Sequence, residues 1–213
     1  MEDIYTIYKI NDTIIRSVED LRDLGLQTDS KLSLRIHCQK IRAKCLKLVG
    51  LMYRVFYGSD PLIYLTYYKT CILPLIDYSA VLYVLVSRSN IVLVEGIQRK
   101  FTKRLHKRVF PYAIIPSYEL RLKKFNLVTL ESRYRSQDLI FLYKIIKLMI
   151  PISTIHINMS SRHKYLIIVP PINTSCFRSS FFHRASIYWN RTVHRDFESL
   201  PAFKHYLSYA ISS

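Results

Sequence analysis

The chain has 213 residues, with 32 Lys and Arg against 15 Asp and Glu, and a formal net charge of +17. Hydrophobic residues make up 50% of it, which excludes a disordered or collagen-like protein, because such chains have too few large apolar side chains to form a core. This length allows one domain or two small ones. The sequence contains only four Gly, which disfavours both a turn-rich barrel or sandwich and a glycine-rich phosphate loop, so we expect helices to dominate.

The charge is distributed unevenly along the chain. Residues 1–29 contain seven acidic and three basic residues, a net charge of −4, which leaves +21 for the other 184 residues. Three long segments, 30–59, 96–118 and 139–195, contain Lys and Arg but no Asp or Glu. A field of this sign favours a polyanionic partner, with nucleic acid first and an anionic membrane surface second.

The first 30 residues have the pattern of short strands. β-Prone residues from Ile4 to Ile10 precede a turn at Asn11-Asp12, and the pattern resumes at Thr13. We expect a small hairpin or sheet edge, because so few residues do not make a sheet domain. Residues 1–30 are therefore interpreted as the end of a larger structural unit. A basic helical bundle over 31–150 and a C-terminal unit of extended chain and short helices over 151–213 are predicted to follow.

The pattern becomes helical over residues 34–57. Ile41, Cys45, Leu48, Met52 and Val55 are spaced three or four positions apart on one face. At 100° per residue, four bases fall along one flank of this apolar stripe: Lys40, Lys44, Lys47 and Arg54. We predict a helix with a core-facing side and a basic ridge beside it.

Two different structures are compatible with the apolar segment 62–86, which follows a predicted helix end at Gly58 and a helix start at Asp60-Pro61. The segment is long enough to span a bilayer. However, Lys69 and Asp77 lie near its middle, where each charge costs about 2.5 to 3.5 kcal/mol on insertion scales. A buried helix, kinked by a proline, at the centre of the bundle is the preferred prediction, and a membrane segment is the alternative.

A third helix is predicted to begin at Ser89-Asn90. Its apolar face comprises Val94, Ile97, Phe101 and Leu105. The rest of the helix carries a cluster of bases: Arg99, Lys100, Lys103, Arg104, Lys107 and Arg108. Like charges at this spacing destabilise an isolated helix, so a bound anion would stabilise it. A face that is merely solvated is the alternative.

The rest of the chain is predicted to contain shorter elements. Ser117 would cap a short helix, and Thr129 a longer one that Pro151 ends. That longer helix carries apolar residues at Tyr134, Phe141, Ile145 and Leu148. Extended chain follows over 151–180, with a strand at 165–169, and short helices at 182–190 and 201–211 are predicted to complete the fold.

Aromatic and basic residues alternate in the segment 177–184, which includes Arg178 and Arg184. Rings and guanidinium groups together suit base stacking and phosphate contacts. The alternative interpretation is that Phe181, Phe182 and Trp189 pack the last helices against the bundle.

The sequence contains no catalytic or metal-binding motif. After residue 29 no two acids are adjacent, whereas two-metal chemistry needs clustered carboxylates. The four Cys form no CxxC pair, and Cys38 and Cys45, two helical turns apart, are typical of core packing. We therefore expect no enzyme activity, cofactor, metal or small-molecule substrate. The N-terminus lacks an apolar signal segment, so we expect an intracellular protein with reduced thiols, and a nuclear location stays open.

Several degenerate motifs follow one another along the chain. They are Asp23-Leu24-Gly25-Leu26 with Asp29-Ser30-Lys31-Leu32, Ile72-Leu73-Pro74 with Tyr78, Glu95 with Gln98 and Phe101, Tyr118 with Arg121-Leu122 and Arg133, and Phe181-Phe182 with Trp189-Asn190 and Leu200-Pro201. In this order they resemble the C-terminal region of reverse transcriptases encoded by non-LTR retrotransposons of the jockey and CR1 type. The similarity covers nearly the whole chain, and Tyr83 stands where that family usually has Trp.

The resemblance implies the thumb and downstream region of a polymerase, a helical unit that holds template and primer. Leu24, Gly25 and Leu26 would correspond to the primer grip. The family's aromatic-x-Asp-Asp box is absent from this chain, so the expectation is nucleic-acid binding without catalysis. Contacts would be mostly to phosphates of RNA or DNA, without sequence preference, and a separate palm-containing polypeptide stays unknown.

Two alternatives to this function stay open. One is a membrane-associated basic protein that uses 62–86 as a membrane segment and its bases on anionic lipid, although a membrane partner is disfavoured. The other is a decayed element with no activity.

Overall fold

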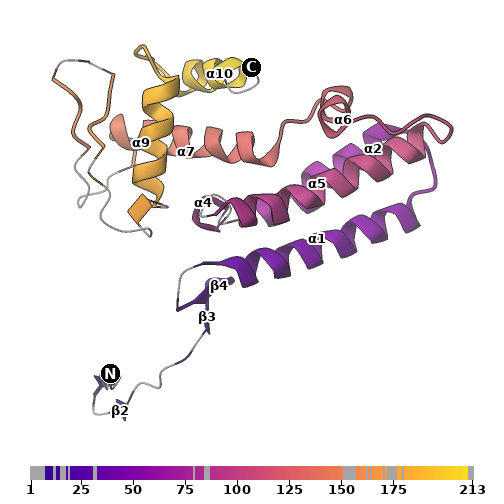
Figure 1. Cartoon of the computed structure of the whole chain (residues 1–213), viewed down its shortest axis with the longest axis horizontal. Coiled ribbons are helices and arrows are strands. Elements are labelled where there is room, and N and C mark those ends of the chain that lie inside the picture. The colour runs from indigo at the N-terminus through magenta and orange to yellow at the C-terminus, as the bar shows by residue number, and fades with distance from the viewer. Residues whose placement is uncertain are drawn as a thin grey trace.

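The protein is mainly helical, with short antiparallel hairpins near its N-terminus (Figure 1). The computed structural model describes residues 8–11, 13–14, 18, 20–30, 33–78, 80–83, 87–150, 157–161, 163, 165–169, 171, 177–178 and 180–210. The predicted fold class is confirmed: a helical bundle follows a short β-hairpin, and the C-terminal segment is partly extended.

Two hairpins occupy the described part of the N-terminal segment. β1 (Lys9–Ile10) pairs with β2 (Thr13–Ile14), and β3 (Asp20–Asp23) pairs with β4 (Leu26–Asp29), both antiparallel. The turn between β3 and β4 is Leu24-Gly25, with φ of 44° and 85°. Positive φ at both central residues is what a tight type I′ hairpin turn requires. The first part of the predicted strand pattern, Ile4 to Ile7, lies outside the described residues.

The two longest described helices lie side by side and run in the same direction (Figure 1). They are α1 (Arg35–Val55) and α5 (Arg88–Val109). Near their starts, the Asn90 side-chain amide donates to the Ser33 carbonyl (3.0 Å). Near their ends, the Arg108 guanidinium donates to the Tyr53 carbonyl (3.1 Å). The basic C-terminal ends of both helices are therefore brought together.

The chain returns from the end of α1 to the start of α5 through a broken helix. Its parts are α2 (Pro61–Tyr67), the π-helical turn η1 (Tyr68–Ile72), α3 (Leu73–Asp77) and α4 (Ala80–Tyr83). Asp60 caps α2 by accepting the Leu62 N–H (2.8 Å), as predicted. The π turn directly precedes Pro74, which has no N–H to continue a regular helix. No helix in the described part of the chain is long and apolar enough to cross a membrane.

The apolar faces of α1 and α5 were predicted with different accuracy. On α5, Val94, Ile97, Phe101 and Leu105 are all fully buried, which confirms the predicted face. On α1, the buried face includes Cys38, Cys45, Val49, Met52 and Tyr53, and Val55 is 56% exposed. The predicted stripe was therefore rotated from the true one, because Tyr53 turns inward to stack on Tyr64, with ring centroids 5.1 Å apart.

Besides the start of α2 at Asp60, two predicted helix starts are confirmed, and one is displaced. Ser117 caps α6 (Tyr118–Lys124), and Thr129 caps α7 (Leu130–Ile146), each by accepting an N–H of the first turn. α5 begins two residues before its predicted start, because Ser87 accepts the Asn90 N–H (3.2 Å). α7 ends at Ile146 rather than near Pro151, and Leu148, predicted on its apolar face, is 84% exposed with φ of 55°.

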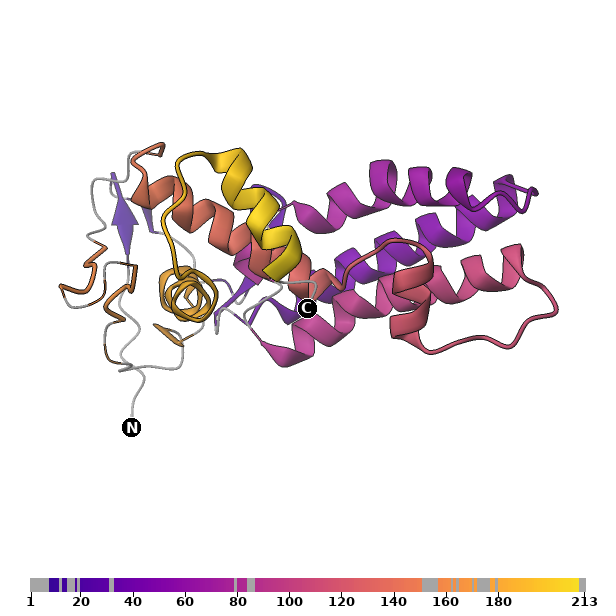
Figure 2. The same cartoon turned by 90° about the horizontal axis from the view of Figure 1, so that it is seen from above.

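The buried residues form two hydrophobic clusters that meet within α7. The first extends from Leu34 to Tyr134 and holds the α1–α5 bundle together. The second, which we call the C-terminal cluster, extends from Leu139 to Leu207. It packs α9 (Phe181–Thr192) and α10 (Leu200–Ala210) against α7 (Figure 2).

The bounds of α9 and α10 were predicted to within a residue or two. The predicted strand at 165–169, in contrast, contributes only an isolated bridge between Met159 and Ile167. The domain limits at 30 and 150 stay predictions.

Candidate nucleic-acid interface

The solvent side of α5 carries a continuous set of bases. Five predicted site residues on this helix are exposed: Arg99, Lys100, Lys103, Arg104 and Lys107. Three of them, Arg99, Lys103 and Lys107, recur every fourth residue and form a stripe about 12 Å long at 1.5 Å rise per residue. That length matches about three to four nucleotides of one strand at 3.4 Å per nucleotide. Burial of Phe101 and Leu105 on the opposite side fixes the stripe toward solvent.

Bases from both long helices surround a pocket of about 580 Å³ where α1 and α5 end. We call it the basic pocket, and its lining residues are Gly50, Tyr53, Arg54, Arg104, Lys107, Arg108 and Pro111. The Arg104 guanidinium lies over the Tyr53 ring, 5.3 Å from its centroid. Arg108 donates to the Tyr53 carbonyl. The lining thus contains four cationic side chains and no carboxylate.

A second pocket of similar size, about 590 Å³, lies over the first half of α5 and has mixed charge. Arg42, Arg88 and Arg99 line it together with Glu95 and Glu131. Arg88 is paired with Glu131 at 2.8 Å. Because two carboxylates share the lining with the arginines, this pocket is a weaker anion site than the basic pocket.

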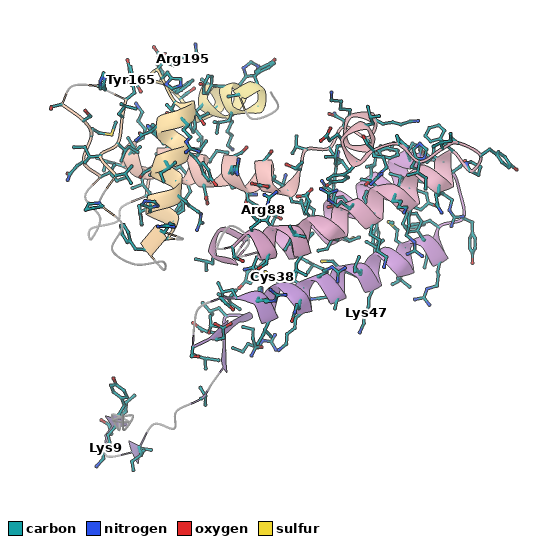
Figure 3. All side chains as sticks on the ribbon, in the orientation of Figure 1. Lys9, Cys38, Lys47, Arg88, Tyr165 and Arg195 are labelled. Carbon is teal, nitrogen blue, oxygen red and sulfur yellow. The ribbon has the colours of Figure 1, made fainter. Side chains whose placement is uncertain are left out.

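The lysines of α1 occupy a different surface from the bases of α5. Lys40, Lys44 and Lys47 are exposed, as predicted, and Figure 3 shows Lys47 pointing away from α5. Lys40 donates from Nζ to the Gln27 side-chain carbonyl of β4 (2.8 Å). Of the four bases predicted to form a ridge on α1, the structure brings only Arg54 to the pocket between the helices.

A buried polar network joins α5 to α6 and α7. One oxygen of Glu95, which is 6% exposed, accepts a hydrogen bond from the Tyr118 hydroxyl, and its other oxygen accepts one from the Leu130 N–H (2.9 Å) in the first turn of α7. Gln98 donates to the Tyr118 hydroxyl (3.0 Å) and accepts from the Tyr68 hydroxyl (2.9 Å). Burial raises the pKa of Glu95, while these donors oppose the rise. Glu95 is therefore an N-terminal anchor of α7, a role that its carboxylate suits because helix N-termini attract negative charge.

Two further contacts connect segments that are distant in the sequence. Arg133 of α7 donates to both oxygens of Asp77 at the end of α3, at 3.1 and 2.6 Å, and this contact raises the pKa of the arginine. The Tyr78 hydroxyl donates to the Leu24 carbonyl in the β3–β4 turn (2.6 Å). The predicted primer-grip residues thus lie at a turn and at the start of β4, and Tyr78, just after α3, binds the backbone of the turn. Leu24 is 84% exposed at the tip, and Leu26 packs against the first cluster.

The two predicted site arginines near the C-terminus have different surroundings. Arg178 is exposed just before α9. Arg184 is 8% exposed and donates to both oxygens of the fully buried Asp138, at 2.8 and 3.3 Å. Its guanidinium is committed to this ion pair between α9 and α7, so we leave it out of the interface. Phe181 packs edge-on against Phe141, with centroids 5.1 Å apart, which fits the alternative interpretation that this aromatic segment packs the fold.

The thiols of α1 are part of the core. Cys38 and Cys45 are fully buried, as predicted, and burial raises their thiol pKa values to about 12 and about 11. Cys71 is exposed, and Cys176 lies outside the described residues. The described residues contain no group of three or more His, Cys, Asp or Glu that could hold a metal ion.

Comparison with known protein families, with curated proteins and with solved structures finds no match.

The predicted site residues include most of the bases that line the basic pocket, but not the other residues that form its walls. Arg108 was recognised only as a member of the charge cluster, and Gly50 and Tyr53 carried no signal, because their role depends on which helix packs beside α1 and in which direction.

Proposed function

We propose that this chain binds nucleic acid, without catalysis, through the basic pocket and the stripe of bases on α5. In this proposal it acts as a thumb-like unit of the reverse transcriptases that its sequence resembles. Contacts are made mostly to phosphates, so RNA and DNA of any sequence are ligands. Arg54, Lys103, Arg104 and Lys107 make the principal contacts.

The observation that carries the proposal is the charge environment of these bases. The ion pairs within the described part of the chain use Arg88, Arg133, Arg135, Lys147 and Arg184. By contrast, Arg54 and the bases of α5 from Arg99 to Arg108 have no carboxylate within ion-pair distance among the described residues. Mutual repulsion of these charges on a rigid helix is relieved when phosphates replace the missing counter-charges.

Contacts between residues of different motifs support the resemblance to the reverse transcriptases. Glu95 and Gln98 meet Tyr118, and Tyr78 meets Leu24, so residues from separate motifs contact one another. A motif order that arose by chance would not require its members to meet in space. This agreement favours a unit related to the thumb region over a chance similarity.

Salt dependence of binding tests the proposal. Fluorescence anisotropy with a labelled duplex, measured between about 50 and 200 mM salt, should give a log-log slope of roughly −5 if about six phosphates are neutralised. Scrambling the duplex sequence should leave the affinity within about threefold, because phosphate contacts carry no sequence information. A flat salt dependence, or no binding at the lowest salt, would reject the proposal.

Charge reversal on the two basic surfaces distinguishes which one binds. The triple variant Lys103→Glu, Arg104→Glu, Lys107→Glu should abolish measurable binding at about 150 mM salt. The matched triple variant Lys40→Glu, Lys44→Glu, Lys47→Glu makes the same change in net charge on the face directed away from α5. It should weaken binding by less, through the general field only. Equal losses in the two variants would show that binding depends on the net charge of the whole molecule and not on an interface at α5.

A further inference from the structure

The basic pocket differs from the stripe on α5 in being a hollow that is lined by two helices and by the chain that follows α5. Arg54 comes from the last turn of α1, Arg104 and Lys107 from the last turns of α5, and Pro111 from the chain that leaves α5. A strand lying along the stripe passes from one base to the next. A group that enters the pocket instead meets cations from two helices at once.

The number of cations exceeds what an internal phosphodiester needs. Each internal phosphate carries one negative charge, whereas a terminal phosphate carries about −1.5 to −2 near neutral pH and offers three acceptor oxygens. The C-terminal dipoles of α1 and α5 contribute only about half a negative charge each, so they do not neutralise four cationic side chains. The charge of the pocket therefore matches a terminal phosphate or a pyrophosphate group better than a phosphate within a strand.

The side chains of the pocket are already oriented for such a group. Arg104 is held over the Tyr53 ring, and Arg108 is tied to the Tyr53 carbonyl. Arg54 of α1 and Lys107 of α5 are exposed and complete the lining. Gly50 leaves the α1 wall open, since a Cβ built there would meet no atom within 4 Å. Guanidinium groups bind phosphate oxygens in pairs, which suits a group with three free oxygens.

We propose that the basic pocket binds a phosphate monoester or pyrophosphate group, which makes it the site for the 5′-phosphorylated end of a nucleic-acid strand. This inference rests on the proposed function, because the ligand that it names is the end of a nucleic-acid strand and not a free anion. It assigns the stripe on α5 to the nucleotides that follow the end and the pocket to the end itself. The chain would then distinguish a phosphorylated from an unphosphorylated strand.

The test compares two single-stranded oligonucleotides of one sequence, with a dye at the 3′ end and either a phosphate or a hydroxyl at the 5′ end. The 5′-phosphate should tighten binding to the full chain about tenfold. Gly50→Glu places a carboxylate in the pocket where there is room for it, and it should remove this preference while weakening binding of the 5′-hydroxyl strand by less than about threefold. Ala43→Glu is the matched control, because it adds the same charge to an exposed position of α1 about 10 Å earlier along the helix, and it should retain the preference.

A thermal-shift measurement with inorganic pyrophosphate separates the two sources of the anion. Pyrophosphate should raise the melting temperature of the wild-type and Ala43→Glu proteins but not that of Gly50→Glu. If neither oligonucleotide binds and pyrophosphate still stabilises through the pocket, the proposed function fails and the anion site stands with a free anion as its ligand. The inference is overturned if the strands bind equally and pyrophosphate has no effect, or if either preference survives Gly50→Glu.

Discussion

Arg184 in the C-terminal cluster and Arg54 at the end of α1 are the same residue type in opposite surroundings. Arg184 is 8% exposed and meets a carboxylate, Asp138, that is itself fully buried. Arg54 is exposed and lines a pocket with three other cations and no carboxylate. One arginine joins α9 to α7, and the other, in the function that we propose, contacts an anion from outside.

Because of this difference, we expect Arg184 to contribute to the free energy of unfolding and Arg54 to contribute to the free energy of ligand binding. Removing a buried charge leaves its partner without compensation in a medium of low dielectric constant, so the whole cost falls on folding. Removing an exposed base changes folding little, because water solvates it equally well in the unfolded chain. Variants at the two positions should therefore affect different measurements.

The largest expected effect is on the buried pair. Asp138→Asn should lower the free energy of unfolding by about 3 to 5 kcal/mol, because it leaves the Arg184 guanidinium buried beside a neutral group. Urea denaturation followed by circular dichroism measures it. The double variant Asp138→Leu, Arg184→Met removes both charges and should recover most of this loss. A double variant as unstable as Asp138→Asn would show that the pair stabilises α7 and α9 directly.

A smaller effect is expected at the basic pocket, and on binding alone. The double variant Arg54→Gln, Lys107→Gln should weaken binding of a 5′-phosphorylated strand by about 2 kcal/mol, or about thirtyfold, through the loss of two charged hydrogen bonds, because Lys107 belongs to both the pocket and the stripe. Its salt slope should fall by about 1.4 to 1.8, since each lost phosphate contact contributes about 0.7 to 0.9. The free energy of unfolding should stay within about 1 kcal/mol of the wild type. A loss of stability comparable to that of Asp138→Asn would contradict the division between folding and binding positions.

The β3–β4 turn allows a third test, of a strained position at the other end of α1 from the basic pocket. Leucine at φ of 44° in Leu24 costs about 1 to 2 kcal/mol, whereas Asn tolerates this region. Leu24→Asn should therefore stabilise the hairpin by about 1 kcal/mol and slow amide hydrogen exchange in β3 and β4 about fivefold. Leu21→Asn, at an exposed position of β3 with ordinary backbone geometry, should not slow exchange. If Leu24→Asn leaves exchange unchanged, the turn is not limiting for the hairpin.

Local signals allowed much of the helical framework to be predicted. Asp60, Ser117 and Thr129 each precede a helix in which they accept a first-turn N–H, and that requirement can be recognised from a few neighbouring residues. The predicted cap, Ser89, lies two residues after the actual cap, Ser87, and the two positions carry the same residue type. On α1, four residues of the predicted stripe pack in the first cluster and only Val55 is exposed. The centre of this broad face was displaced, since it depends on the position of Tyr64, which comes from another helix.

The site depends on contacts that local patterns do not contain. The bases of α5 could be identified as a cluster, because a helical repeat places them on one side of one helix. That Arg54 joins them, and that the α1 lysines do not, follows from the parallel arrangement of α1 and α5 across a broken helix. The pairing of Arg184 with Asp138 joins residues 46 positions apart. From the sequence, Arg184 was indistinguishable from the exposed Arg178.

The smallest expected effect concerns Gly50, where the comparison between folding and binding can be made at one residue. Glycine within a helix costs about 0.8 to 1.0 kcal/mol relative to alanine, and the added Cβ at position 50 would meet no atom within 4 Å. Gly50→Ala should therefore raise the free energy of unfolding by up to about 1 kcal/mol and leave nucleic-acid affinity unchanged, because a methyl group does not fill a pocket of about 580 Å³. Gly25→Ala is the contrasting variant, since φ of 85° strains any side chain there, and it should destabilise the hairpin by about 1 kcal/mol. Urea denaturation, together with amide exchange for the hairpin, measures both. If Gly50→Ala gains stability but loses affinity, the backbone of α1 itself approaches the ligand at Gly50.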